Sequence, residues 1–308
     1  MRKITFVILA GLSAVSLFAS TPSASPAAPP TATPVVNPTP APLPAVTTAP
    51  VTEPTPTPTP FPTPLTISCK PLPKFDPSEQ KSVAKAFKNA EPSPFQQTWL
   101  PEKDKGFEPG NVRLGWKPDA LWIYAVMDDA DVSNPTTKMN EMQDLATTDA
   151  KHYRIVTTLL GDAFEMIVRQ QEPAPYYEFH VTPQNQILQL KWLDWKDYGS
   201  TDWRPGAKNT FLSHLVEGAK LFTSNVWINR ERKQWSVLIS VPAELITGKK
   251  TISAGDMWLF TSARYDALSK DDPNPITSST TLHFRSRNPR RFLSFHRADE
   301  WSHINFQK

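Results

Sequence analysis

Four large aromatic residues lie close together in a polar stretch, where their rings could bind a ligand by stacking. Trp192, Trp195, Tyr198 and Trp203 are spread through the segment KWLDWKDYGSTDWRPG at 191–206. Aromatic rings in loops can stack on ligands because each has an apolar face, and tryptophan and tyrosine add a polar handle. The same rings could instead fold back and cover the open end of the domain. We take Trp192, Trp195 and Trp203 as candidate ligand-binding residues.

Three aspartates, Asp128, Asp129 and Asp131, follow a predicted strand, and clustered carboxylates are typical Ca²⁺ ligands. They are not followed by the glycine-punctuated loop and terminal glutamate of an EF-hand. We therefore favour a solvated turn, keep a structural Ca²⁺ ion as the alternative, and expect no other cofactor. The histidines form no HExxH or similar short motif, so they predict no metal site.

The sequence contains no recognisable nucleophile motif. There is no GxSxG, and Cys69, the only cysteine, precedes the main run of predicted strands. Carboxylates are numerous enough to supply the acid pair of a glycoside hydrolase. We therefore leave enzymatic activity uncertain, favour a non-catalytic protein, and keep a divergent hydrolase acting on O-glycosyl compounds as an alternative.

Short strand patterns dominate the chain from residue 112 onward. Phe164, Met166 and Val168 recur at every second position, as the buried face of a strand requires. The strands are predicted at 112–116, 121–127, 163–170, 176–182, 187–193, 221–228, 234–241 and 257–265. The second is apolar throughout, which indicates burial on both faces. Without intervening helices, the strands favour an all-β fold, an antiparallel β-sandwich of jelly-roll or immunoglobulin-like type. A short N-terminal helix is predicted at 78–90, with Ser78 as its N-cap.

The first twenty residues have the layout of a secretory signal peptide. Arg2 and Lys3 precede an uncharged, largely apolar run at 4–19, and small residues follow it. The run is shorter than the roughly 20 residues that span a bilayer, and charges or prolines interrupt every later apolar segment. We predict a signal peptide at 1–20 and a secreted, periplasmic or cell-surface protein, with an uncleaved N-terminal anchor as the alternative.

Residues 21–66 have the composition of a linker to a domain at 67–308. Sixteen prolines lie between Thr21 and Pro64, where Glu53 is the only charged residue. Such a segment has too little apolar surface to fold, and its proline repeats favour extended polyproline II. The formal net charge of +3 for the whole chain is too balanced for a nucleic-acid-binding protein, so we expect no nucleic-acid partner.

Four motifs between 111 and 306 follow the order of a known family. They are LWIYAVMDDAD (121–131), GDAFEMIV (161–168), PYYEFHVTP (175–183) and FHRADEWSHINF (295–306). In this order they resemble the landmarks of carbohydrate-binding module family 9 and its family-9-like (DOMON-like) relatives. The resemblance implies a β-sandwich that binds sugars with aromatic rings and a few polar side chains.

The resemblance also implies a set of ligand-binding residues: Glu165, Glu178, His180 and Phe295. Phe295 matches one of the two stacking aromatics of the family, and the other position aligns with Leu159 or Leu160. His180 lies where an arginine is common in the family. We therefore take Arg264, on a later strand, as the candidate ligand-binding residue that supplies a planar guanidinium.

These observations predict a secreted, non-catalytic carbohydrate-binding protein linked to polysaccharide breakdown, with a polysaccharide or oligosaccharide as its partner. The leucine at one stacking position leaves a second hypothesis open. In that hypothesis, the chain is a structural or protein-binding sandwich that has lost the sugar site.

Overall fold

The structure is a computed structural model. It describes residues 63–132, 161–171, 175–194, 196, 211–216, 220–268, 276–281 and 295–308, all within one compact unit. The predicted signal peptide and almost all of the predicted linker lie outside these residues.

The described residues are mostly strands. In chain order the elements are β1 (Thr66–Pro71), α1 (Gln80–Ala86), β2 (Pro92–Pro94), β3 (Gly110–Lys117), β4 (Ala120–Asp128), β5 (Ala163–Gln170), β6 (Tyr176–Val181), β7 (Ile187–Trp192), η1 (Phe211–His214), β8 (Thr223–Asn229), β9 (Gln234–Pro242), α5 (Ala243–Thr247), β10 (Met257–Asp266), β11 (Ile276–Ser279), η2 (Ala298–Glu300) and β12 (Ser302–Phe306). The prediction of an all-β fold is confirmed.

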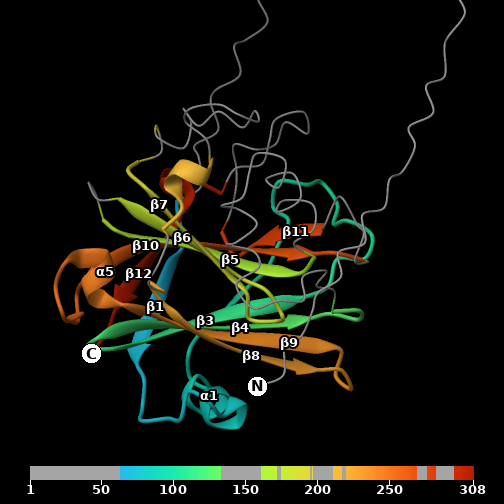
Figure 1. Cartoon of the computed structure of the whole chain (residues 1–308), viewed down its shortest axis with the longest axis horizontal. Coiled ribbons are helices and arrows are strands. Elements are labelled where there is room, and N and C mark those ends of the chain that lie inside the picture. Colours follow the sequence, from blue (N-terminus) through green and yellow to red (C-terminus); the bar gives the residue numbers. More distant parts are fainter. Residues whose placement is uncertain are drawn as a thin grey trace, which may run out of the picture. The chain divides into compact units, whose positions relative to one another are not determined.

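The strands form one continuous sheet with the order β7-β6-β5-β10-β12-β1-β3-β4-β9-β8, while β11 pairs with β10 and β2 with β3. In Figure 1, β1 connects the half of the sheet that contains β5, β6 and β7 to the half that contains β3, β4, β8 and β9. β1 pairs in parallel with both β12 and β3. The pairings therefore describe a curled sheet whose two halves are joined through β1, and they do not confirm the predicted β-sandwich.

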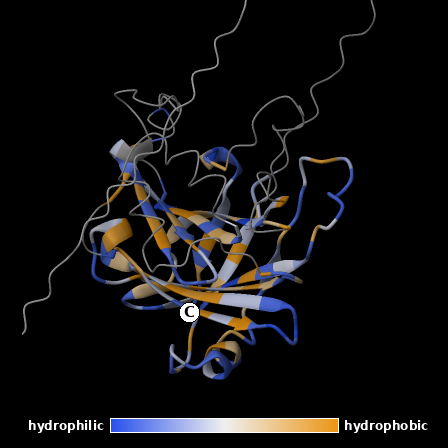
Figure 2. Cartoon of the chain, turned by 45° about the vertical axis from the view of Figure 1, so that its right-hand side comes forward, coloured by the Kyte–Doolittle hydropathy of each residue, from blue (hydrophilic) through white to orange (hydrophobic). Residues whose placement is uncertain are grey.

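The two halves of the sheet share one hydrophobic core. Phe164 and Phe179 from one half pack in the same cluster as Ile123 and Ile239 from the other. These residues lie at alternating positions along their strands, so one face of each strand turns toward the core. Figure 2 shows hydrophobic residues gathered along the strands and hydrophilic residues in many of the connecting segments. Burial of this shared face holds the halves together.

The helix α1 covers the outer face of β4. Val83 and Phe87 pack against Tyr124 and Leu238 there, while alternate residues of β4 reach the main core. The predicted burial of this strand on both faces is therefore confirmed. The N-cap is Glu79, one residue after the predicted Ser78, whose hydroxyl donates a hydrogen bond to Asp76 Oδ1 at 2.6 Å. The helix ends at Ala86, four residues earlier than predicted.

The strands that the sequence pattern does not predict are short, namely β1, β2, β11 and β12. β1 buries Ile67 and Cys69 and pairs with β12, which lies at the other end of the domain sequence. No local pattern reveals a pairing between segments so far apart. No helix in the part of the chain that the structure describes is long and apolar enough to cross a membrane.

Candidate functional site

Three of the predicted ligand-binding residues meet on one face of the sheet. Glu165 on β5 lies directly opposite His180 on β6, and Glu178 lies two residues before His180. Because side chains alternate along a strand, all three project from the face opposite to the one that carries Phe164 and Phe179 into the main core. Each of the three is at most 6% exposed. We call this group, with Tyr265 and His296, the carboxylate–imidazole cluster.

Glu178 is the central acceptor of this cluster. His180 Nε2 lies 2.6 Å from Glu178 Oε1, and Trp192 Nε1 donates to Glu178 Oε2 at 2.8 Å. His296 Nε2 lies 3.5 Å from the same Oε2 atom. A buried carboxylate is tolerated only where donors or positive charges compensate its lost hydration, and here three ring nitrogens surround it.

Glu165 has its own donor. The Tyr265 hydroxyl donates to Glu165 Oε2 at 2.6 Å, and His180 Nε2 lies 3.6 Å from that oxygen. The Tyr265 ring lies nearly parallel to the His180 ring, with an interplanar angle of 13°. Tyr265 is half-buried, which makes it the most exposed member of the cluster.

Burial and neighbouring charges raise the pKa values of some groups in the cluster and lower those of others. Burial raises the pKa of Glu165 to about 7 and lowers the pKa of His296 to about 4. Burial would also lower the pKa of His180, but the carboxylates of Glu165 and Glu178 outweigh it and raise that pKa. Burial would raise the pKa of Glu178, yet His296, His180 and Trp192 together lower it.

We expect the stability of the domain to fall on both sides of a pH maximum. Glu165 binds a proton more tightly in the folded state than in the unfolded state, so its contribution is present below about pH 4.5 and is lost as the pH rises through about 7. His180, whose pKa is also raised, acts in the same direction. His296 acts in the opposite direction, because its contribution is present above about pH 6.5 and is lost as the pH falls through about 4.

Glu165→Gln should therefore remove part of the loss of stability at higher pH. The free energy of unfolding, measured by urea denaturation from about pH 5 to pH 8, should decline less steeply with pH in the variant than in the wild type. If the free energy of unfolding declined with pH equally steeply in the two proteins, the raised pKa of Glu165 in the folded state would be contradicted.

The predicted stacking residues lie beside this cluster, but their rings are packed against other side chains. Trp192 is fully buried and stacks on His214 with a centroid distance of 4.1 Å. Phe295 is 6% exposed and meets Trp99 edge to face at 6.2 Å. Trp195 and Trp203 lie outside the described residues, as do Leu159 and Leu160.

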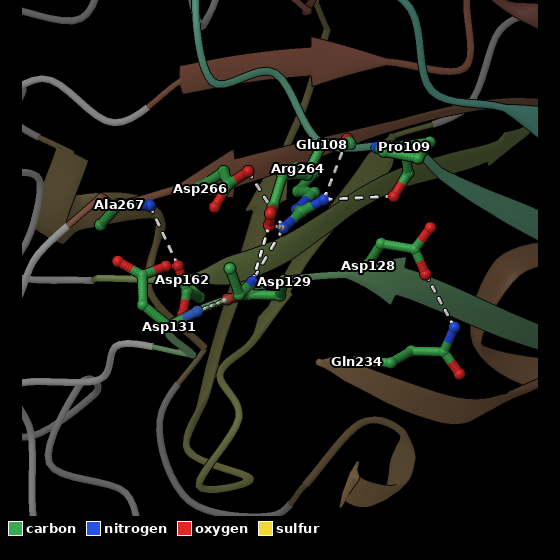
Figure 3. A network of polar contacts seen from close by, with 11 residues as sticks. Glu108, Pro109, Asp128, Asp129, Asp131, Asp162, Gln234, Arg264, Asp266 and Ala267 are labelled. Atoms are coloured by element: carbon green, nitrogen blue, oxygen red, sulfur yellow. Dashed lines mark hydrogen bonds and ion pairs between the residues drawn. The ribbon is translucent and has the colours of Figure 1, made fainter. Parts of the chain in front are cut away.

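The structure does not bring Arg264 to the carboxylate–imidazole cluster. On β10, Arg264 pairs with Phe164, whereas Ala263 pairs with Glu165, so the Arg264 side chain lies on the core face. Its Nη2 atom lies 3.0 Å from Asp266 Oδ2, 3.4 Å from Asp129 Oδ2 and 3.8 Å from Glu108 Oε2 (Figure 3). Arg264 therefore joins β10 to the chain beside β3 and β4, in the other half of the sheet.

Burial raises the pKa of Asp266 to about 7, and the neighbouring carboxylates contribute to this rise against the effect of Arg264. Burial also raises the pKa of Asp129. One guanidinium thus does not compensate all the acidic groups around it. Asp128 belongs elsewhere, since it accepts a hydrogen bond from Gln234 Nε2 at 2.8 Å.

Sequence reasoning missed Tyr265, Tyr176 and the role of His296. The Tyr176 hydroxyl lies 3.0 Å from His296 Nδ1, which orients that ring toward Glu178. Tyr265 directly follows Arg264, so the strand alternation shows that only one of the two can share a face with Glu165. Only the register between β5 and β10 decides which one does.

No family model matches this sequence, and no curated protein matches it. Among solved structures, the fold is similar to that of a candidate carbohydrate-binding protein from Bacteroides uniformis, with a TM-score of 0.51 and 11% identity over 79% of this chain and 99% of the other.

Two further similar structures are of a carbohydrate-binding module family 9 from Caldicellulosiruptor kristjanssonii. The complex with cellotriose has a TM-score of 0.46 and 11% identity, covering 78% of this chain and 93% of the module. The complex with glucose has a TM-score of 0.45 and 12% identity, covering 78% of this chain and 95% of the module. The similarity to the Bacteroides uniformis protein is a similarity of fold, and it confirms the β-rich fold that the family-9-like resemblance implies.

Proposed function

We propose that this protein is an exported, non-catalytic carbohydrate-binding protein that binds its ligand at the carboxylate–imidazole cluster. The observation that carries the proposal is the convergence of Glu165, Glu178 and His180 on one face of β5 and β6, beside the half-buried ring of Tyr265. We infer that a ligand reaches the cluster at Tyr265.

The chemistry of the cluster suits sugar hydroxyls. A carboxylate accepts hydrogen bonds from several hydroxyls, and a protonated imidazole such as that of His180 donates from both ring nitrogens. A tyrosine ring has an apolar face for the C–H groups of a pyranose and a hydroxyl for its polar groups. Few polar groups, fixed by neighbours and set among aromatic rings, are typical of small-ligand sites.

The predicted export and tether fit an extended target. If residues 21–62 adopt polyproline II, they span on the order of 130 Å at about 3.1 Å per residue. A domain on such a spacer can meet an insoluble or surface-bound polysaccharide away from its attachment point. We therefore propose a secreted or surface-displayed protein that acts in polysaccharide breakdown by holding substrate rather than cleaving it.

Isothermal titration with xylan, cellulose and pectic oligosaccharides tests the proposal. We expect one of these ligand classes to bind, and Glu165→Gln to weaken that binding about 10–100-fold, because a hydrogen bond to a charged acceptor contributes about 1.5–3 kcal/mol. No reducing sugar should be released in the same mixtures.

The matched control is Glu91→Gln, a change at an exposed glutamate outside the cluster. It should bind as tightly as the wild type. Absence of heat with all three ligand classes, or equal affinity for Glu165→Gln and wild type, would count against binding at this cluster.

A further inference from the structure

The carboxylate–imidazole cluster holds more negative than positive charge when its groups are ionised. Glu165 and Glu178 supply two carboxylates, and both residues are buried. Burial opposes the charged form of His180, but the two carboxylates outweigh it and raise the pKa of that ring. His296 adds no charge near neutral pH, because burial lowers its pKa to about 4. In the described part of the chain, no lysine or arginine pairs with either carboxylate, so one negative charge is left over.

Glu165 is the carboxylate that lacks a cation of its own. His180 Nε2 lies 2.6 Å from Glu178 Oε1 but 3.6 Å from Glu165 Oε2, so the proton on this nitrogen serves Glu178. Burial raises the pKa of Glu165 to about 7, and the Glu178 carboxylate adds to this rise against the effects of His180 and Tyr265. The neighbours of Glu165 therefore compensate its ionised form only in part.

Glu165 also has an unused acceptor. Its Oε2 atom accepts from the Tyr265 hydroxyl at 2.6 Å, but none of the residues that the structure describes donates a hydrogen bond to Oε1. The Nδ1 atom of His180 is buried and likewise has no hydrogen-bond partner. A buried polar atom without a partner costs free energy, so both atoms favour a ligand that completes their hydrogen bonds.

We propose that the carbohydrate bound at this cluster carries a protonated amine, as a glucosamine residue does, and that its ammonium group pairs with Glu165 Oε1. This inference rests on the proposed function and names the substrate class. An ammonium group supplies the missing positive charge together with hydrogen-bond donors, and hydrogen bonds between charged groups are the strong ones. The hydroxyl oxygens of the same sugar can accept from His180 Nδ1, and the face of the half-buried Tyr265 ring attracts a cation.

Neutral and acidic sugars fit the cluster less well. A neutral sugar can donate a hydroxyl to Oε1 but leaves the excess negative charge uncompensated. A uronate would bring a third carboxylate to Glu165 and Glu178, and the juxtaposition of like charges in a desolvated site disfavours binding. A general attraction of the protein for polycations does not account for a preference for amines, because the formal net charge of the chain is +3.

Three trimers that differ only at carbon 2 of each sugar test this proposal. Calorimetric titration of the full chain at neutral pH compares the β-1,4-linked trimers of glucosamine, N-acetylglucosamine and glucose. The glucosamine trimer should bind about 10–100-fold more tightly than the glucose trimer, because its donor to Glu165 is charged. The N-acetylated trimer, in which the amine has become an uncharged amide, should bind no more tightly than the glucose trimer.

Glu165→Gln locates the contact with the amine. The variant keeps the size of the side chain but loses its charge, so its affinities for the glucosamine and glucose trimers should differ by less than about threefold. Glu91→Gln, at an exposed glutamate outside the cluster, is the matched control and should keep the full preference. A full preference in Glu165→Gln, or loss of the preference in Glu91→Gln, would overturn the assignment to Glu165.

The wild-type titrations separate a failure of this inference from a failure of the proposed function, and they do not depend on the folding of a variant. Equal affinities for the glucosamine and glucose trimers, or tighter binding of the glucose trimer, would overturn the pairing with an amine and leave carbohydrate binding in place. Absence of heat with all three trimers and with xylan, cellulose and pectic oligosaccharides would overturn both proposals.

Discussion

Glu178→Ala is expected to lower the free energy of unfolding by about 3–5 kcal/mol. Glu178 is 5% exposed, and its carboxylate accepts a hydrogen bond from Trp192 Nε1 at 2.8 Å. His180 Nε2 lies 2.6 Å and His296 Nε2 3.5 Å from its oxygens. Truncation removes the acceptor that these ring nitrogens share and also leaves a cavity. Urea denaturation at neutral pH, followed by tryptophan fluorescence and by circular dichroism, measures the loss.

Two further variants separate this effect from a general sensitivity to substitution. Glu178→Gln keeps the volume and one acceptor oxygen, so it should be less destabilising than alanine. Glu91→Ala removes an exposed glutamate and should change stability by less than about 0.5 kcal/mol. If Glu178→Ala were as stable as Glu91→Ala, the hydrogen-bonded network around Glu178 would not contribute to folding.

Arg264→Met is expected to destabilise the domain by about 3–5 kcal/mol. The Arg264 side chain is fully buried, and it is the cation beside Asp129, Asp266 and Glu108. Methionine fills similar space but leaves the carboxylates without a positive neighbour. Arg264→Lys keeps the charge and loses the planar fork, so its stability should lie between those of methionine and wild type.

This result would assign a structural role to Arg264. If Arg264 bound a sugar, its substitution would weaken sugar binding and leave the fold intact. Here we expect the reverse order, with loss of stability as the primary effect. Arg232→Met, at an exposed arginine after β8, is the control and should unfold like the wild type. An Arg264→Met protein as stable as this control would contradict the position of the Arg264 side chain on the core face of β10.

Local sequence patterns determine much of this fold. Alternation in β5 places Phe164, Met166 and Val168 on the core face and Glu165 on the other face, as the structure shows. The strand at 234–241 is predicted to within one residue of β9. Period-two burial is a property of consecutive residues, so a single segment carries the information.

The composition of the carboxylate–imidazole cluster is only partly available from the sequence. Glu178 and His180 are two apart on one strand, which places them on the same face without further information. The hairpin formed by β5 and β6 then brings Glu165 opposite His180. These three residues can be predicted together because neighbouring strands that follow one another in sequence commonly pair.

Tertiary structure alone decides the rest. The register between β10 and β5 places Ala263, not Arg264, opposite Glu165, and so brings Tyr265 to the cluster and Arg264 to the core side. The parallel pairing of β1 with β12 joins the ends of the domain, and His296 reaches Glu178 across more than a hundred residues. A shift of one residue in such a pairing would exchange the two faces of a strand. That register is set by packing and hydrogen bonds between distant segments, and therefore no local pattern in the sequence contains it.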